Sequence, residues 1–254
     1  MASSSLSTFP NSFNAIVIGA SGGIGSALYT ALTAHPHAGQ VIGLSRHPAA
    51  AEDYINLDDP AAIEAAAERC RPHGPFHLII NATGRLHGDG LSPEKTLTPE
   101  KTLTPEKTWR HLNADALAAA YQANCIGPVM AARHFLPLMA KDTKALYAFL
   151  SARVGSISDN RVGGWHGYRA AKAALNMMIK NLAIEMAMKS RNAIILGLHP
   201  GTVATPLSEP FRGNVRHDIF TPEMAAGHLL TVIDNAELSD SGHQIDWNGQ
   251  TIPA

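Results

Sequence analysis

Short apolar runs rich in β-branched residues recur along the chain, and longer stretches with helical spacing separate them. Apolar runs of this length are typical of strands that are buried on both faces of a parallel sheet. We expect such strands at residues 14–18, 40–44, 76–80, 145–150, 193–198 and 244–247. The segments between them predict helices at 26–32, 60–69, 115–140, 165–189 and from Thr221 onward. This alternation predicts an α/β fold, with a doubly wound parallel sheet and helices on both of its faces.

The pattern fills a single domain that extends from residue 14 to residue 250. The residues before it are rich in serine, and they have neither the basic region nor the apolar core of a secretory signal. We therefore expect residues 1–13 to form a disordered tail. No uninterrupted apolar run is long enough to span a bilayer, so the sequence predicts no membrane partner.

The segment 91–108 departs from this pattern because it contains three tandem hexapeptides. Leu-Ser-Pro-Glu-Lys-Thr comes first, and Leu-Thr-Pro-Glu-Lys-Thr follows twice. A proline every six residues prevents a continuous helix or a central strand. Three copies of six residues are also too short for a solenoid. We expect a mobile surface loop, and two interpretations stay open: a neutral tandem duplication, or a lid or partner-docking loop near the functional site.

Composition excludes several classes of function. The net charge of −1 gives no indication of a nucleic-acid partner. The two cysteines, Cys70 and Cys125, do not suggest a disulfide framework, and we expect them to pack in the interior of a cytoplasmic protein. The 13 histidines do not show the spacing of paired metal ligands, so the sequence predicts no metal site.

Four glycines, Gly19, Gly22, Gly23 and Gly25, stand between the first expected strand and the first expected helix. Their spacing fits Gly19-x3-Gly23-x-Gly25 and also Gly19-x2-Gly22-x2-Gly25. A strand, a glycine-rich turn and a helix together present free backbone N–H groups to a phosphate. The glycines permit a tight turn and a close approach of the backbone to a pyrophosphate, although their spacing differs from the common G-x-G-x-x-G pattern. We expect this turn, with Ser21 and Ile24, to bind a dinucleotide.

The end of the second expected strand distinguishes between two dinucleotides. An NAD enzyme usually has a carboxylate there to bind the ribose 2′-hydroxyl, whereas this chain has Ser45 and Arg46. A 2′-phosphate requires a cation, so NADP(H) is favoured over NAD(H). The alternative is that Arg46 is an ordinary solvated loop residue.

Tyr168 and Lys172 lie four residues apart in an expected helix, so their side chains share one face. The phenol of tyrosine titrates near ~10, which is too high for easy proton exchange at neutral pH. A neighbouring ammonium group favours the phenolate and lowers that pKa. The pair therefore predicts a general acid–base group.

The order of these motifs resembles that of the short-chain dehydrogenases/reductases. The resemblance covers the chain from about Asn14 to Gln250. Besides the glycine turn and the Tyr168–Lys172 pair, it is carried by Asn81-Ala82-Thr83-Gly84, by Asn124, and by the loop Pro200-Gly201-Thr202-Val203. The stretch from Gly155 to Trp165 further resembles the C-factor-like branch of the family.

The resemblance implies a Rossmann-like fold and a site for the cofactor. Additional cofactor contacts are implied for Asn56, Leu57, Asn81, Ala82, Thr83, Pro200, Gly201 and Val203. Lys172 would also hold the nicotinamide ribose, and Asn124 would steady a water molecule in a proton relay. Relatives often pair through their long helices, so a homodimer or homotetramer is an expectation for this chain.

One position departs from the family pattern. The family's serine usually stands in Ser-x-x-Gly, and counting back from Gly155 places Ala152 there. Ser151 precedes this position and Ser156 follows the glycine. A serine hydroxyl would orient the substrate carbonyl and stabilise the charge that develops on its oxygen. We favour Ser151 for this role and keep Ser156 as the alternative.

The sequence thus predicts an NADP(H)-dependent oxidoreductase that acts on a small carbonyl or alcohol substrate, with Tyr168 as the general acid and base. A non-catalytic NADP-binding sensor or signalling protein is the alternative, because the serine is out of register. A sugar-nucleotide epimerase or dehydratase shares the Tyr-x-x-x-Lys pattern, but it would normally need an added substrate domain.

Overall fold

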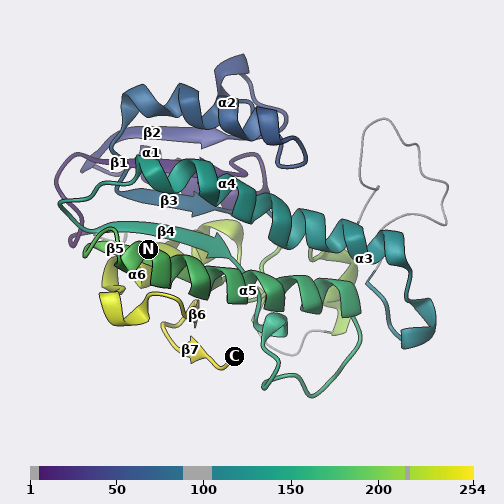
Figure 1. The fold of residues 1–254 in the computed structure, drawn as a ribbon. Helices are drawn as coiled ribbons and strands as arrows, with labels where there is room; N and C mark the ends of the chain where they lie inside the picture. Colours follow the sequence, from purple (N-terminus) through teal and green to yellow (C-terminus); the bar gives the residue numbers. More distant parts are fainter. Residues whose placement is uncertain (1–5, 88–104, 215–217) are drawn as a thin grey trace.

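The computed structural model describes residues 6–87, 105–214 and 218–254. Within these ranges the chain forms one seven-stranded sheet in the order β2-β1-β3-β4-β5-β6-β7 (Figure 1). All neighbouring strands are parallel except the last pair, β6 and β7. The strands are β1 Phe13–Ile18, β2 Ala38–Leu44, β3 Leu78–Asn81, β4 Ala145–Leu150, β5 Ala193–His199, β6 Gln244–Asp246 and β7 Thr251–Ile252.

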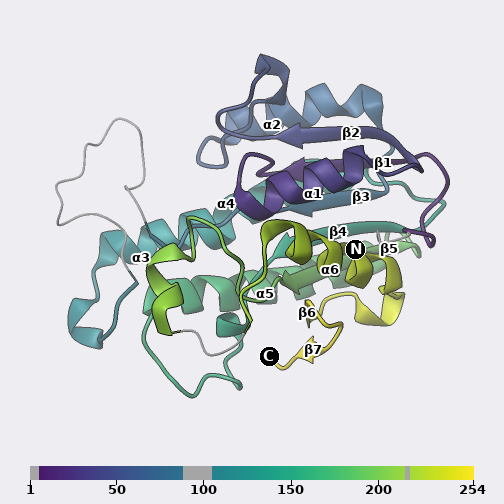
Figure 2. The same ribbon diagram turned by 180° about the vertical axis from the view of Figure 1, so that it is seen from behind.

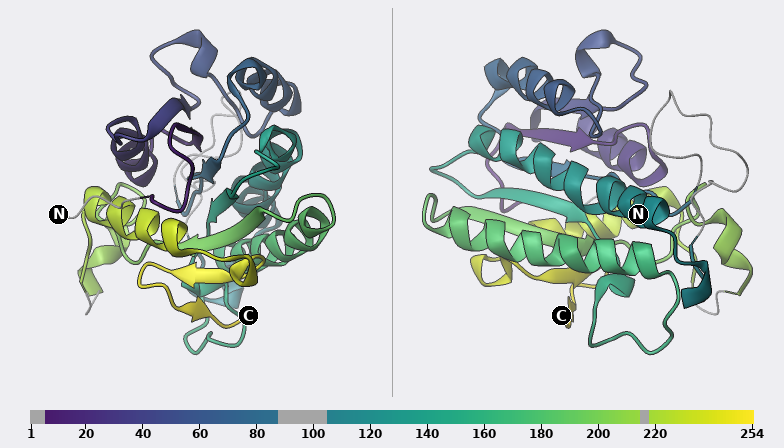
Figure 3. Two further views of the ribbon diagram at one scale, coloured as in Figure 1. Left: turned by 90° about the vertical axis from the view of Figure 1, so that its left-hand side faces the viewer. Right: turned by 45° about the vertical axis from the view of Figure 1, so that its right-hand side comes forward.

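Helices cover both faces of this sheet, which confirms the predicted doubly wound α/β fold. Helices α2 (Pro60–Cys70), α4 (Gly127–Phe135) and α5 (His166–Ala187) lie on the face seen in Figure 1. Helices α1 (Gly23–Thr33) and α6 (Pro222–Asn235) cover the opposite face (Figure 2). The end-on view in Figure 3 shows the three layers.

The two faces divide the buried side chains of each strand between two cores. In β1, Ile16 and Ile18 pack into the core beneath α2, α4 and α5, whereas Ala15 and Val17 pack into the core beneath α1 and α6. Side chains alternate across a strand, so a strand covered on both sides is apolar at nearly every position. This is why the strands appear in the sequence as continuous apolar runs.

The long helix expected at 115–140 is divided in the structure. Helix α3 (Ala114–Tyr121) runs into a π-helical turn at Gln122–Ile126, and α4 then begins at Gly127. Pro128 explains the irregularity because it has no N–H to bond the carbonyl group four residues earlier, at Asn124. The widened turn keeps the helical path continuous while it leaves that carbonyl without its usual helical donor.

Residues 6–13 are packed in the structure, in contrast to the tail expected at residues 1–13, of which residues 1–5 lie outside the described ranges. Leu6 is fully buried, and Phe9 and Phe13 join it in the core beneath α1 and α6. The backbone N–H groups of Ser7 and Thr8 donate to the carboxylate of Asp234, over 3.1 and 2.9 Å. These apolar contacts and hydrogen bonds offset the entropy lost on ordering residues 6–13.

The carboxyl ends of the parallel strands meet at one edge of the sheet, where the functional residues predicted from the sequence gather. Strand order reverses between β1 and β3, and such a switch point is where open α/β sheets bind ligands. Most of the repeated segment lies outside the described residues; Pro105 to Thr108, the end of its third copy, lie within them. No helix in the described ranges has both the length and the apolar character needed to cross a membrane.

Candidate active site

One cavity of about 470 Å³ opens at this edge of the sheet. Its walls are the turn between β1 and α1, the segments that follow β3, β4 and β5, and the start of α5. The structure brings eleven of the predicted site residues to this cavity: Ser21, Gly23, Ile24, Ala82, Thr83, Ser151, Tyr168, Lys172, Pro200, Gly201 and Val203. The glycine turn and the Tyr168–Lys172 pair therefore share a single space.

The glycine turn is shaped by close backbone contacts. Gly19 has a φ of +91°, which favours glycine. A Cβ atom on Gly25 would lie 2.1 Å from the carbonyl oxygen of Gly19, and one on Gly23 would lie 2.6 Å from Cγ2 of Thr205. Helix α1 begins after Gly22 with no side-chain cap on its first N–H groups. A compact turn with uncapped amides beside a cavity fits the pyrophosphate of a dinucleotide.

The end of β2 lies directly beside this turn. The carbonyl oxygen of Leu44 accepts hydrogen bonds from Gly19 and Ala20, over 2.7 and 3.0 Å. Ser45, the next residue, is buried, whereas the side chain of Arg46 is 51% exposed. Nη1 of Arg46 lies 3.9 Å from a carboxylate oxygen of Asp58. An exposed ion pair at this distance contributes little to stability, so the guanidinium group of Arg46 stays accessible to another anion.

Asn56, Leu57 and Asn81 lie outside the cavity lining. The side-chain oxygen of Asn56 accepts the N–H of Asp58, and the carbonyl oxygen of Leu57 accepts Nε2 of Gln122 in the π-helical turn. The side chain of Asn81 accepts the hydroxyl of Thr83 over 2.5 Å. These contacts fix the loops beside the glycine turn.

Tyr168 and Lys172 lie on one face of α5, as predicted, but their electrostatics differ from the expectation. Nζ of Lys172 is 5.8 Å from the centroid of the Tyr168 ring, and it donates to the carbonyl oxygen of Leu150 over 2.8 Å. Burial lowers the pKa of Lys172 to about 8 and raises the pKa of Tyr168 to about 12. In this arrangement desolvation of the phenol outweighs any attraction from the ammonium group.

Asn124 is fully buried beside the cavity, and its side chain is committed to backbone partners. Its Nδ2 donates to the carbonyl oxygens of Arg85 and Ala120, over 2.7 and 3.0 Å, and its Oδ1 accepts the N–H of Arg85 over 2.9 Å. Both amide protons are thus used within the protein. The side chain clamps the segment after β3, where a Cβ atom on Gly84 would lie 3.5 Å from Nζ of Lys172.

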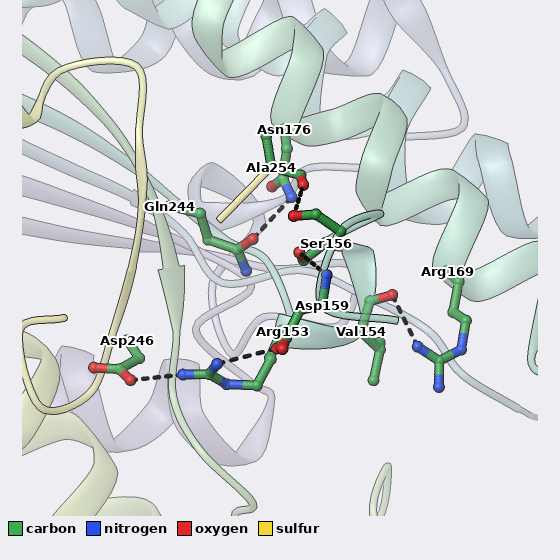
Figure 4. A network of polar contacts seen from close by, with 10 residues as sticks. Arg153, Val154, Ser156, Asp159, Arg169, Asn176, Gln244, Asp246 and Ala254 are labelled. Atoms are coloured by element: carbon green, nitrogen blue, oxygen red, sulfur yellow. Dashed lines mark hydrogen bonds and ion pairs between the residues drawn. The ribbon is translucent and has the colours of Figure 1, made fainter. Parts of the chain in front are cut away.

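The two candidate serines have different positions. Ser151 lines the cavity, and so does Ala152, whereas Ser156 is buried outside the lining. The hydroxyl of Ser156 accepts the N–H of Asp159 over 3.1 Å (Figure 4). The hydroxyl of Ser151 donates to Oδ1 of Asn176 over 2.7 Å. A hydroxyl has one proton, so Ser151 has none left for a substrate carbonyl in this arrangement.

Sequence reasoning missed the network that holds this loop. Arg153 bridges the carboxylates of Asp246 and Asp159, over 2.9 and 3.1 Å (Figure 4). Arg169, one residue after Tyr168, donates to the carbonyl oxygens of Val154 and Gly164. Asp246 lies 93 residues from Arg153 in the chain, and nothing in the sequence indicates that they meet.

One part of the cavity lining, which the sequence also did not reveal, is apolar and aromatic. The ring centroid of Trp165 lies 5.1 Å from that of Phe211 and 6.4 Å from that of Tyr168, both with edge-to-face geometry. Leu86, Val154 and Leu207 complete this wall.

Comparison with known proteins gives a family match over most of the chain. Residues 14–215 match the family model described as short chain dehydrogenase. The 1-hydroxy-2-glutathionyl-2-methyl-3-butene dehydrogenase of Rhodococcus sp. (strain AD45) is 35% identical over 131 residues, which are 52% of this chain and 55% of that protein. The C-signal protein of Myxococcus xanthus is 28% identical over 137 residues, which are 54% of this chain and 78% of that protein. The match to the Rhodococcus protein thus spans about half the length of either chain.

Solved structures share the fold over nearly the whole chain. An NADPH-bound carbonyl reductase from chicken fatty liver has a TM-score of 0.76 and 24% identity, and covers 96% of this chain and 100% of its own. A short-chain dehydrogenase/reductase from Burkholderia multivorans with bound NADP has a TM-score of 0.74 and 20% identity over the same shares. At these identities the likeness establishes the fold.

Proposed function

The chain belongs to the short-chain dehydrogenase family. We propose that it is an NADP(H)-dependent oxidoreductase that reduces a small, neutral carbonyl compound or oxidises the corresponding alcohol. One observation carries the proposal. A single cavity extends from the glycine turn to the Tyr168 phenol, so a dinucleotide and a substrate have adjoining places.

The residues of this chain fit NADP(H). Ser21, Gly22 and Gly23 would hold the pyrophosphate through their backbone N–H groups at the start of α1. Arg46, at the end of β2, would bind the 2′-phosphate. Pro200, Gly201 and Val203 would support the nicotinamide half from the loop after β5. Bound NADPH and NADP in the two structural neighbours support the choice of cofactor.

When bound, the nicotinamide supplies the hydride for reduction or accepts it for oxidation. Tyr168 gives a proton to the carbonyl oxygen as the charge develops there, and takes it back in the reverse direction. The raised pKa of Tyr168 in the cofactor-free protein makes the phenol a weaker proton donor, so proton transfer requires this pKa to fall in the cofactor complex. Lys172, a buried residue of the cavity lining, would hold the nicotinamide ribose and lower the pKa of Tyr168 in that complex.

Ala152 leaves this site without a hydroxyl at the position of the family's serine. A donor to a developing oxyanion contributes strongly to the rate, so we expect slow turnover rather than none. Ser151 would serve the reaction only if its hydroxyl turned from Asn176 toward the cavity.

The apolar wall supports a neutral substrate. Trp165, Phe211 and Leu86 offer flat or aliphatic surface in the cavity lining. Among the described residues that line the cavity, the arginine is Arg153, and it is paired with two carboxylates, so it is not available to bind an acidic substrate. A ketone, aldehyde or quinone with an apolar or aromatic group fits these contacts.

A signalling role is the second candidate, because C-signal is among the relatives and the serine position is altered. One assay separates the two. The purified protein is first titrated with NADPH, and NADPH oxidation is then followed with a panel of aldehydes, ketones and quinones. Turnover of at least one apolar carbonyl compound supports the enzyme. Tight NADPH binding with no turnover across the panel supports the second candidate.

A further inference from the structure

We propose that Glu106, in the third copy of the repeated hexapeptide, is a positioning residue of the active site. It fixes the start of α5 and thereby places Trp165 and Tyr168 for the reaction. This inference rests on the proposed function. It assigns a role to one part of the repeat, a motif that the reaction itself leaves unexplained.

Glu106 is 6% exposed and contacts the start of α5 through both its backbone and its side chain. Its carbonyl oxygen accepts the N–H of Trp165 over 2.6 Å, and Oε2 accepts the N–H of Gly167 over 3.1 Å. Trp165, at the cap position of α5, offers no side-chain hydrogen bond of its own. A carboxylate from a distant segment therefore performs the capping that the local sequence lacks.

Charge and space favour a carboxylate at this position. The N-terminus of a helix carries partial positive charge, and α5 is a long helix of 22 residues. Within the described ranges no lysine or arginine forms an ion pair with Glu106, so the amides of α5 are its principal partners. A Cβ atom on Gly167 would lie 3.0 Å from Oε1, which shows how closely the carboxylate covers the helix start.

The backbone that Glu106 holds is an unusual one. Gly163, Gly164 and Trp165 have φ angles of +68°, +65° and +50° in succession. Glycine adopts such angles readily, but tryptophan rarely does. A non-glycine residue keeps such a conformation only when the surrounding structure restrains it. The hydrogen bond from the Trp165 N–H to the Glu106 carbonyl oxygen is such a restraint.

The backbone that Glu106 restrains lies within three residues of the reacting phenol, because Trp165 and Tyr168 are three residues apart. The ring of Trp165 lines the cavity and packs edge-to-face on Phe211 and Tyr168. Tyr168 follows Gly167 directly, so a change at the start of α5 moves both the apolar wall and the proton donor. Reactions that depend on alignment lose rate steeply with small displacements.

The repeat offers a matched control. Glu100 stands at the same place in the preceding copy, and both copies read Leu-Thr-Pro-Glu-Lys-Thr. We would compare Glu106→Ala with Glu100→Ala and with Glu106→Gln, which keeps an amide oxygen that can accept the Gly167 N–H. For each protein we would measure NADPH affinity and stoichiometry, the melting temperature, and kcat and KM for a carbonyl substrate found in the panel.

We expect Glu106→Ala to lower kcat/KM by about tenfold or more, with a raised KM for the carbonyl compound. NADPH should still bind at one per chain with an affinity within about threefold of the parent, because the glycine turn and Arg46 are unchanged. Glu100→Ala should match the parent, and Glu106→Gln should recover most of the loss. If Glu106 were needed only for folding, Glu106→Ala would instead lower the NADPH stoichiometry and the activity in the same proportion, and the KM for the carbonyl compound would not change.

A readout independent of turnover keeps this inference separate from the proposed function. In protein labelled with 5-fluorotryptophan, the Trp165 resonance is assigned with Trp165→Phe. Glu106→Ala should shift that resonance and Glu100→Ala should not, even if no carbonyl substrate is found. Equal behaviour of the two alanine variants, in spectrum and in kinetics, would overturn the assignment and leave the repeat as a neutral duplication.

Discussion

The hydroxyl of Ser151 donates to Oδ1 of Asn176 over 2.7 Å, and Nδ2 of Asn176 donates in turn to Oε1 of Gln244 over 2.8 Å. This chain of hydrogen bonds ties the end of β4 to α5 and β6. It directs the serine proton away from the cavity, whereas Ala152, the next residue, lines the cavity without a polar group.

Restoring a hydroxyl at residue 152 should therefore increase activity. We expect Ala152→Ser to raise kcat for a carbonyl substrate by about tenfold, because a donor near the developing oxyanion stabilises the transition state. Ser151→Ala is the matched control, and it should lower the free energy of unfolding by about 1 kcal/mol with less than about threefold change in kcat. A large loss of kcat in Ser151→Ala, with no gain of kcat in Ala152→Ser, would instead assign the catalytic hydroxyl to Ser151.

Lys172 should destabilise the cofactor-free protein near neutral pH. Its pKa is about 8 in the fold, against the ordinary value of 10.5. Between these values the unfolded chain holds a proton that the folded chain has released, so this lysine makes stability rise with pH from about 8 upward. Below pH 8 the full cost of burying the ammonium group is present.

Lys172→Met removes that cost and leaves the carbonyl oxygen of Leu150 unpaired. We expect a net gain of about 1–2 kcal/mol in the free energy of unfolding at pH 7, shrinking between pH 8 and 10, together with loss of turnover. Urea unfolding of both proteins at pH 7, 8, 9 and 10 measures the difference. A difference that stays constant with pH would contradict the depressed pKa of Lys172.

Arg46 should determine the choice between the two dinucleotides. We expect Arg46→Ala to raise the KM for NADPH by about tenfold and to change the KM for NADH by less than about twofold, because only NADPH carries the 2′-phosphate. Arg71→Ala, at an exposed arginine paired with Glu68, serves as the control for loss of a surface cation. Equal effects on both dinucleotides would show that Arg46 is an ordinary solvated residue.

The fold was accessible from the sequence because the central strands are almost continuously apolar, and the glycine turn and the Tyr168–Lys172 pair depend on local spacing. The packing of residues 6–13 was missed because it depends on Asp234, more than 220 residues away. The ion pair of Arg153 with Asp246 and the hydrogen bonds of Glu106 with the start of α5 were missed for the same reason, because they join residues far apart in the sequence. The pKa of Tyr168 was predicted in the wrong direction for the cofactor-free protein, because its desolvation depends on tertiary packing that spacing does not reveal.

In the proposed NADPH-dependent reaction the Tyr168 phenol carries the proton. Tyr168→Phe removes the hydroxyl and keeps the ring that packs on Trp165. Tyr147→Phe, which removes a phenol hydroxyl buried outside the cavity lining, is the control. We predict that Tyr168→Phe binds NADPH like the parent and loses at least about 100-fold in kcat, while Tyr147→Phe retains activity. Parent-like turnover in Tyr168→Phe would show that the Tyr168 hydroxyl does not carry the proton.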